Sequence, residues 1–154
     1  MISYACMGKL PKAFPERLLP RIARECSRLC GKRASGKAVV GLRFTSEAKI
    51  ADLNRAYRGK KTSTDVLSFS ATEQGEDPFP EPIQKGGERD LGDVVICPAV
   101  AAREARRRSI DLTEELVRLV VHGTMHLCGF DHADQKGEER MFGLQEAAVE
   151  KVLG

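Results

Sequence analysis

One segment of this chain, LTEELVRLVVHGTMHL (112–127), is apolar on most of its circumference when it is drawn as a helix. A helix that is apolar nearly all round must be surrounded by other elements, so it is expected at the centre of the fold. Asp111, with Glu114 three residues later, is a start signal for this helix, and Gly129 can supply the left-handed residue that stops it. Its apolar side chains are Leu116, Val117, Leu119, Val120, Val121, Met125 and Leu127.

The rest of the chain predicts helices and strands in irregular order. Strands are expected over 38–44, 65–70 and 91–97. One helix is expected to end at Gly31 and either to begin or to kink near Pro20, and the next is capped by Thr45 or Ser46 and ends at Gly59. Two more helices are expected over 98–108 and about 135–152. The last of these helices is expected to pack Met141, Phe142, Leu144, Ala148 and Val152. Segment 71–90 is rich in Pro, Gly and acidic residues, so we expect a long exposed loop there. Without repeats or a second core, the chain is expected to form one α+β domain over residues 1–154.

Composition limits the classes of protein to which the chain can belong. It is 42% hydrophobic and 31% charged, which is typical of a globular protein. No apolar run approaches the roughly 20 residues that a membrane span needs, so we expect no membrane partner. The first residues lack the pattern of a signal peptide, and the five cysteines match no disulfide framework. We therefore expect free thiols and a cytoplasmic location.

Charge is spread unevenly along the chain. Basic residues concentrate in 1–37, 43–61 and 94–110, and acidic residues concentrate in 62–93 and 111–154. This pattern suits a polyanionic partner on one surface, although a solvated charged face is the commoner explanation. Two sets of arginines could follow an RNA backbone, namely Arg17, Arg21, Arg24 and Arg28, and Arg103, Arg106, Arg107 and Arg108.

All three histidines lie in the single window HGTMHLCGFDH (122–132). His122 and His126 are four residues apart on the expected central helix, so both rings leave the same face and can converge on one metal ion. The reversal at Gly129 lets His132 present a third ring. Three neutral nitrogen ligands leave a fourth tetrahedral position for water, which is the mark of a catalytic zinc site.

Packing is the alternative explanation for these histidines. One histidine on an apolar helix is usually a satisfied core residue, and two at this spacing can be accidental. Three in one window are hard to attribute to packing, because burying imidazoles without partners costs several kcal/mol. We therefore predict one bound divalent metal ion. Three imidazoles suit zinc best here, although copper, nickel and iron also accept them.

The window departs from the H-E-x-x-H motif of zinc peptidases, in which the glutamate is the general base. The residue at that place is Gly123, which cannot accept a proton. A base would have to come from Asp131, Asp134 or the acidic loop. We favour a different role for Asp131, in which its carboxylate orients His132 or His126 without contacting the metal.

The histidine window resembles the H-G-x-x-H-L-x-G-[YF]-D-H signature of the YbeY family, bacterial rRNA maturation factors that are metal-dependent endoribonucleases. Further matching stretches are LNRAYRGKKTSTDVLSF (53–69), LGDVVIC (91–97) and EERMFGLQE (138–146). The resemblance implies a small mixed β-sheet packed with helices around a central metal-bearing helix, in an arrangement similar to that of zinc peptidases. It also implies that His122, His126 and His132 bind the metal, usually zinc, and that Arg58 lies near the metal cleft. This chain has Lys61 where the family commonly has Asp, and Ser70 where it often has Pro.

For function, the resemblance implies a single-strand-specific endoribonuclease in maturation of the 3′ end of small-subunit ribosomal RNA and in ribosome quality control. Its partners would be precursor ribosomal RNA, the small ribosomal subunit, and ribosomal or assembly proteins. Arg58 can give a two-pronged contact to a phosphate, and Lys60 and Lys61 add positive charge. Two alternatives stay open. One is a metallopeptidase-like hydrolase with a displaced base, and the other is a non-catalytic, metal-stabilised module of ribosome assembly.

Overall fold

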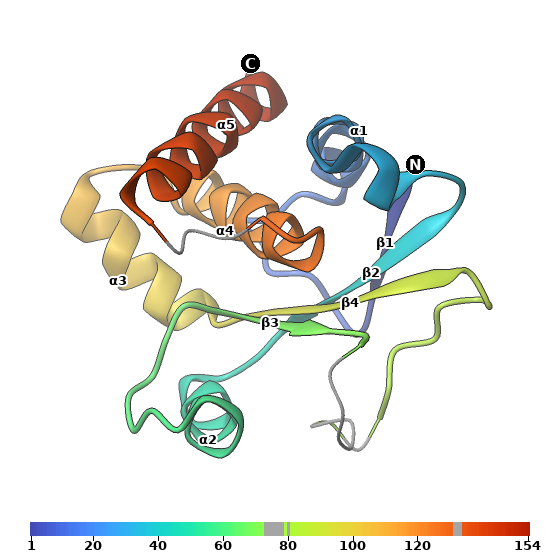
Figure 1. Cartoon of the computed structure of the whole chain (residues 1–154). Coiled ribbons are helices and arrows are strands. Elements are labelled where there is room, and N and C mark those ends of the chain that lie inside the picture. Colours follow the sequence, from blue (N-terminus) through green and yellow to red (C-terminus); the bar gives the residue numbers. More distant parts are fainter. Residues whose placement is uncertain (73–78, 80, 131–133) are drawn as a thin grey trace.

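A computed structural model describes residues 1–72, 79, 81–130 and 134–154 of the chain. Its strands form one sheet in the order β1-β2-β4-β3 (Figure 1), with bounds β1 (Ile2–Cys6), β2 (Ala38–Phe44), β3 (Val66–Ser70) and β4 (Arg89–Ile96). Strand β2 is parallel to both of its neighbours, whereas β3 is antiparallel to β4, so the sheet is mixed. The α-helices of the described residues are α1 (Leu19–Cys30), α2 (Glu47–Arg58), α3 (Pro98–Arg108), α4 (Leu112–Leu127) and α5 (Gln135–Leu153). The predicted α+β fold with a small mixed sheet is confirmed.

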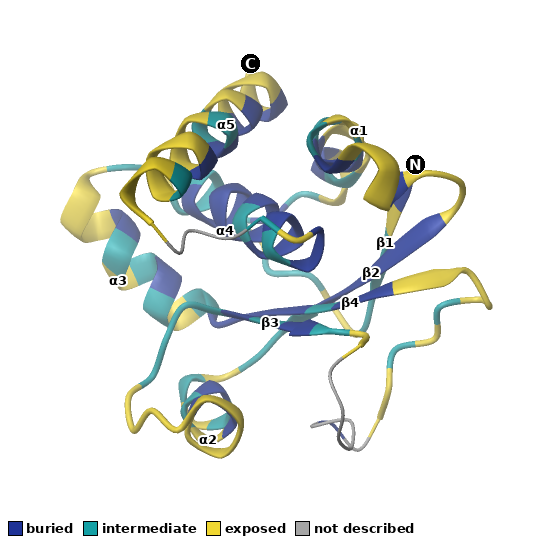
Figure 2. Ribbon diagram, viewed as in Figure 1, coloured by how far each residue is buried: buried dark blue, intermediate teal, exposed yellow. Residues whose placement is uncertain are grey.

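Helix α4 occupies the centre of the molecule, as its sequence predicts. It lies between the sheet and α5, with α1 beside it, while α2 covers the opposite face of the sheet near β3 (Figure 1). Figure 2 shows α4 almost wholly buried, in contrast to the exposed outer sides of α3 and α5. None of the helices in the described ranges is both long and apolar enough to cross a bilayer.

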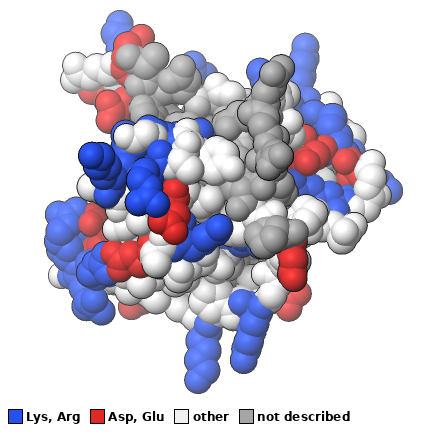
Figure 3. Space-filling model, turned by 90° about the horizontal axis from the view of Figure 1, so that it is seen from below, with Lys and Arg blue, Asp and Glu red and all other residues white. Residues whose placement is uncertain are grey.

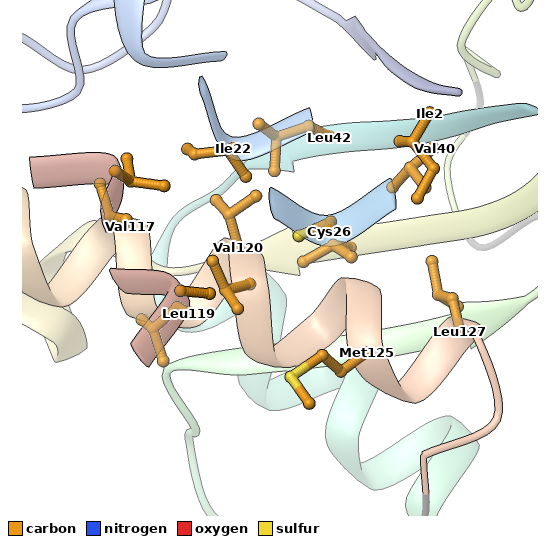
Figure 4. Close-up of a cluster of buried hydrophobic side chains, with 14 of the residues drawn as sticks. Ile2, Ile22, Cys26, Val40, Leu42, Val117, Leu119, Val120, Met125 and Leu127 are labelled. Atoms are coloured by element: carbon orange, nitrogen blue, oxygen red, sulfur yellow. The ribbon is translucent and has the colours of Figure 1, made fainter. Parts of the chain in front are cut away.

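Strand alternation builds a core on each face of the sheet. In β4, Val94 and Ile96 pack toward α4, whereas Val95 packs toward α2. Successive residues of a strand point to opposite faces, so a strand covered on both sides is apolar at consecutive positions. Figure 4 shows the α4 side of this core, where side chains of α4 meet those of α1, β1 and β2. Its labelled members are Ile2, Ile22, Cys26, Val40, Leu42, Val117, Leu119, Val120, Met125 and Leu127.

Most predicted helix ends are confirmed. Pro20 lies in the first turn of α1, so that helix starts there and does not kink. The Oγ atom of Ser46 accepts a hydrogen bond from the Lys49 backbone N–H at the start of α2. Gly59 ends α2 in the left-handed conformation, with φ of 69°. Asp111 does precede α4, but its side chain makes no capping hydrogen bond.

The structure adds an element that the sequence did not indicate. Strand β1, with the sequence ISYAC, forms the edge of the sheet beside β2. Only Ile2 is fully buried in it, so the strand lacks the alternation by which strands are recognised. Its place depends on pairing with β2, some 36 residues further along the chain, where Ile2 is the partner of Ala38.

Three expectations about packing are wrong. Phe142 is 57% exposed and does not belong to the core. Cys30 and Cys128 form a disulfide that joins the end of α1 to the turn after α4, with 5.5 Å between their Cα atoms, so these two thiols are not free. Phe79, within the segment expected to be an exposed loop, is 8% exposed and packs in the core beneath α2. Residues 73–78 and 80 of that segment lie outside the described residues.

Candidate metal centre and cleft

His122 and His126 lie one turn apart on α4 and face each other. Their Nε2 atoms are 3.0 Å apart, and their rings meet edge to face with centroids separated by 4.5 Å. The i, i+4 spacing predicted this convergence, and the structure brings the two rings together.

The other nitrogen of each ring faces an acceptor. His126 Nδ1 lies 3.1 Å from the backbone carbonyl oxygen of Phe130, and His122 Nδ1 lies 2.7 Å from Oε1 of Gln145. A carbonyl oxygen only accepts, so in these contacts both Nδ1 atoms donate. In the neutral rings the proton is then on Nδ1, and each Nε2 carries a lone pair directed at the other ring.

This arrangement fits a divalent metal ion. Two acceptors 3.0 Å apart repel unless a proton or a cation lies between them. Two tetrahedral ligands at the usual zinc–nitrogen distance of about 2.0–2.1 Å would be roughly 3.3 Å apart, close to the observed separation. Among the described residues no group of three or more His, Cys, Asp or Glu side chains could hold a metal. The predicted third ligand, His132, and the predicted orienting residue, Asp131, lie outside the described residues.

The turn after α4 places the acceptor for His126. Gly129 has φ of 91°, a value that few residues other than glycine adopt, and the Phe130 backbone N–H donates to the Met125 carbonyl. The chain therefore folds back over the last turn of α4, which brings the Phe130 carbonyl to the His126 ring. The disulfide at Cys128 ties this turn to α1.

Gly123, between the histidines, allows α4 to pack tightly on the sheet. A Cβ atom there would lie 2.7 Å and 2.9 Å from the two Cγ atoms of Val94. The Gly123 carbonyl also accepts a hydrogen bond of 3.2 Å from Ser68 Oγ of β3. Gly123 stands where a zinc peptidase has its glutamate base, and it is also needed for the close packing of α4 on the sheet. This packing holds both histidines beside β3.

A cleft of about 330 Å³ opens beside the histidine pair, between α4 and β3. Its described lining residues are Arg58, Val66, Leu67, Ser68, Ser70, His122, His126 and Leu127. Arg58 belongs to α2, on the other side of the sheet, and reaches this cleft at the edge strand β3. Its Nη2 atom donates to the Ser68 carbonyl oxygen at 2.5 Å, and its guanidinium carbon lies 5.0 Å from the centroid of the Phe69 ring. The predicted neighbours Arg58, His122 and His126 therefore share one cleft.

Other predicted RNA contacts do not converge on the cleft. Lys60 and Lys61 are exposed after α2 and are not among its described lining residues. Several arginines of the two sets form ion pairs within the chain, as Arg103 does with Glu47 at 2.6 Å and Arg107 with Glu104. Figure 3, which views the molecule from below, shows Lys and Arg interspersed with Asp and Glu on that face.

Gln145, the acceptor for His122, was not predicted from the sequence. It is 6% exposed and lies on the face of α5 that also buries Met141, Ala148 and Val152. A polar residue in the middle of an apolar helical stripe was the available signal. His122, Gln145 and the exposed Phe142 also line a second cavity, of about 160 Å³.

Asp65 is a second unpredicted residue near the site, immediately before β3. Burial raises the pKa of its carboxyl above the ordinary value. Hydrogen bonds from the backbone N–H groups of Asp65 and Val66, together with the nearby His122, oppose this rise in pKa, whereas Glu104 adds to it. Asp65 therefore lies within electrostatic range of His122.

Comparison with known proteins agrees with the resemblance drawn from the histidine window. The family model described as Endoribonuclease YbeY matches residues 12–153. The endoribonuclease YbeY of Moorella thermoacetica is 42% identical over 118 residues, which cover 77% of this chain and 75% of that protein. The endoribonuclease YbeY of Halalkalibacterium halodurans is 37% identical over 131 residues, covering 85% and 82% of the two chains.

A solved structure has a similar fold. The solution structure of TM1509 from Thermotoga maritima superposes with a TM-score of 0.59 at 28% sequence identity, covering 99% of this chain and 89% of that one. The match of the family model covers almost the whole chain and includes both described histidines, Arg58 and Gln145. The chain therefore belongs to the YbeY endoribonuclease family.

Proposed function

We propose that this chain, over residues 1–154, is a single-domain endoribonuclease that hydrolyses RNA in the cleft between α4 and β3. The observation that carries the proposal is the pair of histidine Nε2 atoms that lie 3.0 Å apart in a cleft also lined by Arg58. The endoribonuclease names of its relatives support an RNA substrate. No equivalent observation favours a peptidase, because Gly123 occupies the place of the peptidase base.

One divalent metal ion, preferably zinc, would be held by His122 and His126, with His132 as the third ligand. When bound, such an ion supplies positive charge for the non-bridging phosphate oxygens and lowers the pKa of water toward neutrality. Asp131 is proposed to orient His132 or His126 by a hydrogen bond. A metal-bearing central helix beside an edge strand is the arrangement that we propose this chain shares with zinc peptidases.

Arg58 is proposed to bind the scissile phosphate. Its guanidinium lies at the rim of the cleft, where it can offer two parallel N–H donors to phosphate oxygens. The contact with the Ser68 carbonyl holds the side chain at the edge of β3 before RNA arrives. Lys60 and Lys61, exposed next to it in sequence, would add charge along the RNA backbone and not at the reacting phosphate.

A single-stranded substrate suits this surface. The exposed ring of Phe142 lines the second cavity together with His122 and offers a face on which an unpaired base can stack. We propose that the substrate in the cell is the precursor of small-subunit ribosomal RNA near its 3′ end. If the protein acts in ribosome maturation and quality control, it would function in the cytoplasm, and its partners there would be ribosomal and assembly proteins.

Replacement of His126 tests the proposal. Purified wild type and His126→Ala are incubated with a single-stranded RNA and, separately, with an unstructured protein, each with and without chelator. We expect wild type to cleave only RNA, chelator to stop cleavage, and His126→Ala to be inactive with an unchanged circular dichroism spectrum. Glu150→Ala, an exposed change on α5, is the control and should cleave normally. Full RNA cleavage by metal-free His126→Ala, or chelator-sensitive proteolysis with intact RNA, would overturn the proposal.

A further inference from the structure

We infer that Gln145 is a positioning residue for the metal ligand His122, and that Glu146 and Arg118 fix the orientation of its amide. The inference rests on the metal site of the proposed function, but it concerns residues of α5 and the first half of α4. Four side chains form a continuous path that leaves α4 at Arg118, crosses α5 and returns to α4 at His122.

The first contact sets the tautomer of His122. Gln145 Oε1 lies 2.7 Å from His122 Nδ1 and accepts a hydrogen bond from it, which keeps the proton on Nδ1 so that Nε2 is the atom able to bind a cation. A rotation of the amide by 180° would present the NH₂ group to Nδ1 instead. The ring would then have to carry its proton on Nε2, the tautomer that cannot bind metal through that atom.

The second contact selects between these two amide orientations. Gln145 Nε2 donates to Oε2 of Glu146 at 3.1 Å. An ionised carboxylate has no proton to donate, so it accepts from the NH₂ end of the amide and rejects the carbonyl end. The neighbouring carboxylate therefore turns the amide oxygen toward His122.

The third contact keeps Glu146 ionised and in place. Arg118 donates to it through Nε at 2.9 Å and Nη2 at 2.7 Å, a two-pronged geometry. These hydrogen bonds lower the pKa of the Glu146 carboxyl below its ordinary value. Arg118 is only 7% exposed and is also bonded to Glu114 and Glu115, so it is held within a network of charges.

Arg118 and His122 are themselves four residues apart on α4, so the path begins and ends on one face of the same helix. The face of α5 opposite them would otherwise be apolar, since Met141, Ala148 and Val152 share it with Gln145. Core packing alone would favour an apolar residue at position 145. A buried glutamine bonded to a metal-site histidine is better explained by orientation of that histidine.

Gln145→Leu keeps the volume and removes the acceptor, so zinc affinity should fall by about 10–100-fold. Gln145→Glu presents an acceptor oxygen in either orientation of its carboxylate, so its zinc affinity should be close to that of wild type. Glu146→Gln can either accept or donate, so it no longer selects one amide orientation and should lower the affinity by less than Gln145→Leu. Val152→Ala, a buried truncation two turns along the same face, is the control for loss of stability and should bind zinc as wild type does.

The experiment measures the dissociation constant for Zn²⁺ by competition with a chromogenic chelator, and the ring ¹⁵N chemical shifts of His122 in metal-free protein. We expect the Nδ1–H tautomer in wild type and a mixture of tautomers in Gln145→Leu, together with the weaker zinc binding. Unchanged affinity and tautomer in Gln145→Leu, or equal losses in Val152→Ala, would overturn the inference. If wild type itself binds no zinc, the proposed metal site fails, which is a different result from failure of the positioning role.

Discussion

His122 and His126 present their Nε2 atoms to each other at 3.0 Å while their Nδ1 atoms are bonded to Gln145 and to the Phe130 carbonyl. The helix supplies the spacing, but the acceptors come from α5 and from the turn after α4. Three parts of the fold therefore cooperate to leave two lone pairs in one place. This relationship links the packing of the chain to the chemistry proposed for it.

Two glycine substitutions on helices should have opposite effects on stability. Gly123→Ala places a methyl group within 3 Å of Val94, so it should lower the free energy of unfolding by about 1–3 kcal/mol. Gly143→Ala on α5 meets no atom within 4 Å and should raise it by roughly 0.5–1 kcal/mol, because alanine favours the helix. Urea unfolding of both variants measures the difference. A stabilising Gly123→Ala would show that α4 does not rest on β4 as described.

The ion network around Arg118 should be far more important for stability than an exposed pair. Among the described residues, Arg118→Met leaves Arg108, at 3.5 Å, as the ion-pair partner of Glu115, which is 1% exposed, so the change should cost about 3–5 kcal/mol of unfolding free energy. Arg55→Met breaks the exposed pair with Asp52 and should cost at most about 1 kcal/mol. Chemical denaturation of the two variants compares the costs, and equal losses would argue against a buried network.

Reduction of the Cys30–Cys128 disulfide should lower the stability of the wild-type protein. This bond closes a loop with a sequence separation of 98 residues, and losing such a link typically costs about 2–5 kcal/mol. The melting temperature should fall when dithiothreitol is added to wild type but should not change in the double variant Cys30→Ala/Cys128→Ala. If dithiothreitol left the melting temperature of wild type unchanged, this would contradict the Cys30–Cys128 disulfide.

Asp65 should make stability depend on pH. Burial raises its folded pKa above the unfolded value, so its contribution to stability is complete below the unfolded pKa and is lost as the pH rises through the folded pKa. Asp65→Asn removes this loss. In metal-free protein, the unfolding free energy of Asp65→Asn relative to wild type should therefore increase between about pH 3.5 and pH 7. A constant or decreasing difference would mean that the folded pKa is not raised.

Local patterns in the sequence predicted much of the fold. The apolar circumference of 112–127 placed α4 at the centre, and Ser46, Gly59 and Pro20 marked helix ends where the structure has them. Such features depend on neighbours within a few residues. Strand β1 and the Cys30–Cys128 pair were missed because both depend on contacts between distant segments.

In the candidate site, too, local features could be predicted from the sequence and contacts between distant segments could not. The i, i+4 spacing predicted the convergence of His122 and His126, since one helix fixes it. The presence of Arg58 in their cleft required the family resemblance, because α2 lies on the other face of the sheet. Gln145 stands out in the sequence as a polar residue within an apolar stripe, but its contact with His122 depends on the packing of α5 on α4.

We propose that RNA hydrolysis needs one metal ion held by the histidine pair. The most direct measurement is the rate of RNA cleavage by chelator-treated wild type as Zn²⁺ is added stepwise to a known concentration of protein. We expect no cleavage before metal is added, a linear rise in rate with added Zn²⁺, and a plateau at one equivalent of metal. Full cleavage by protein shown to contain no metal would contradict it.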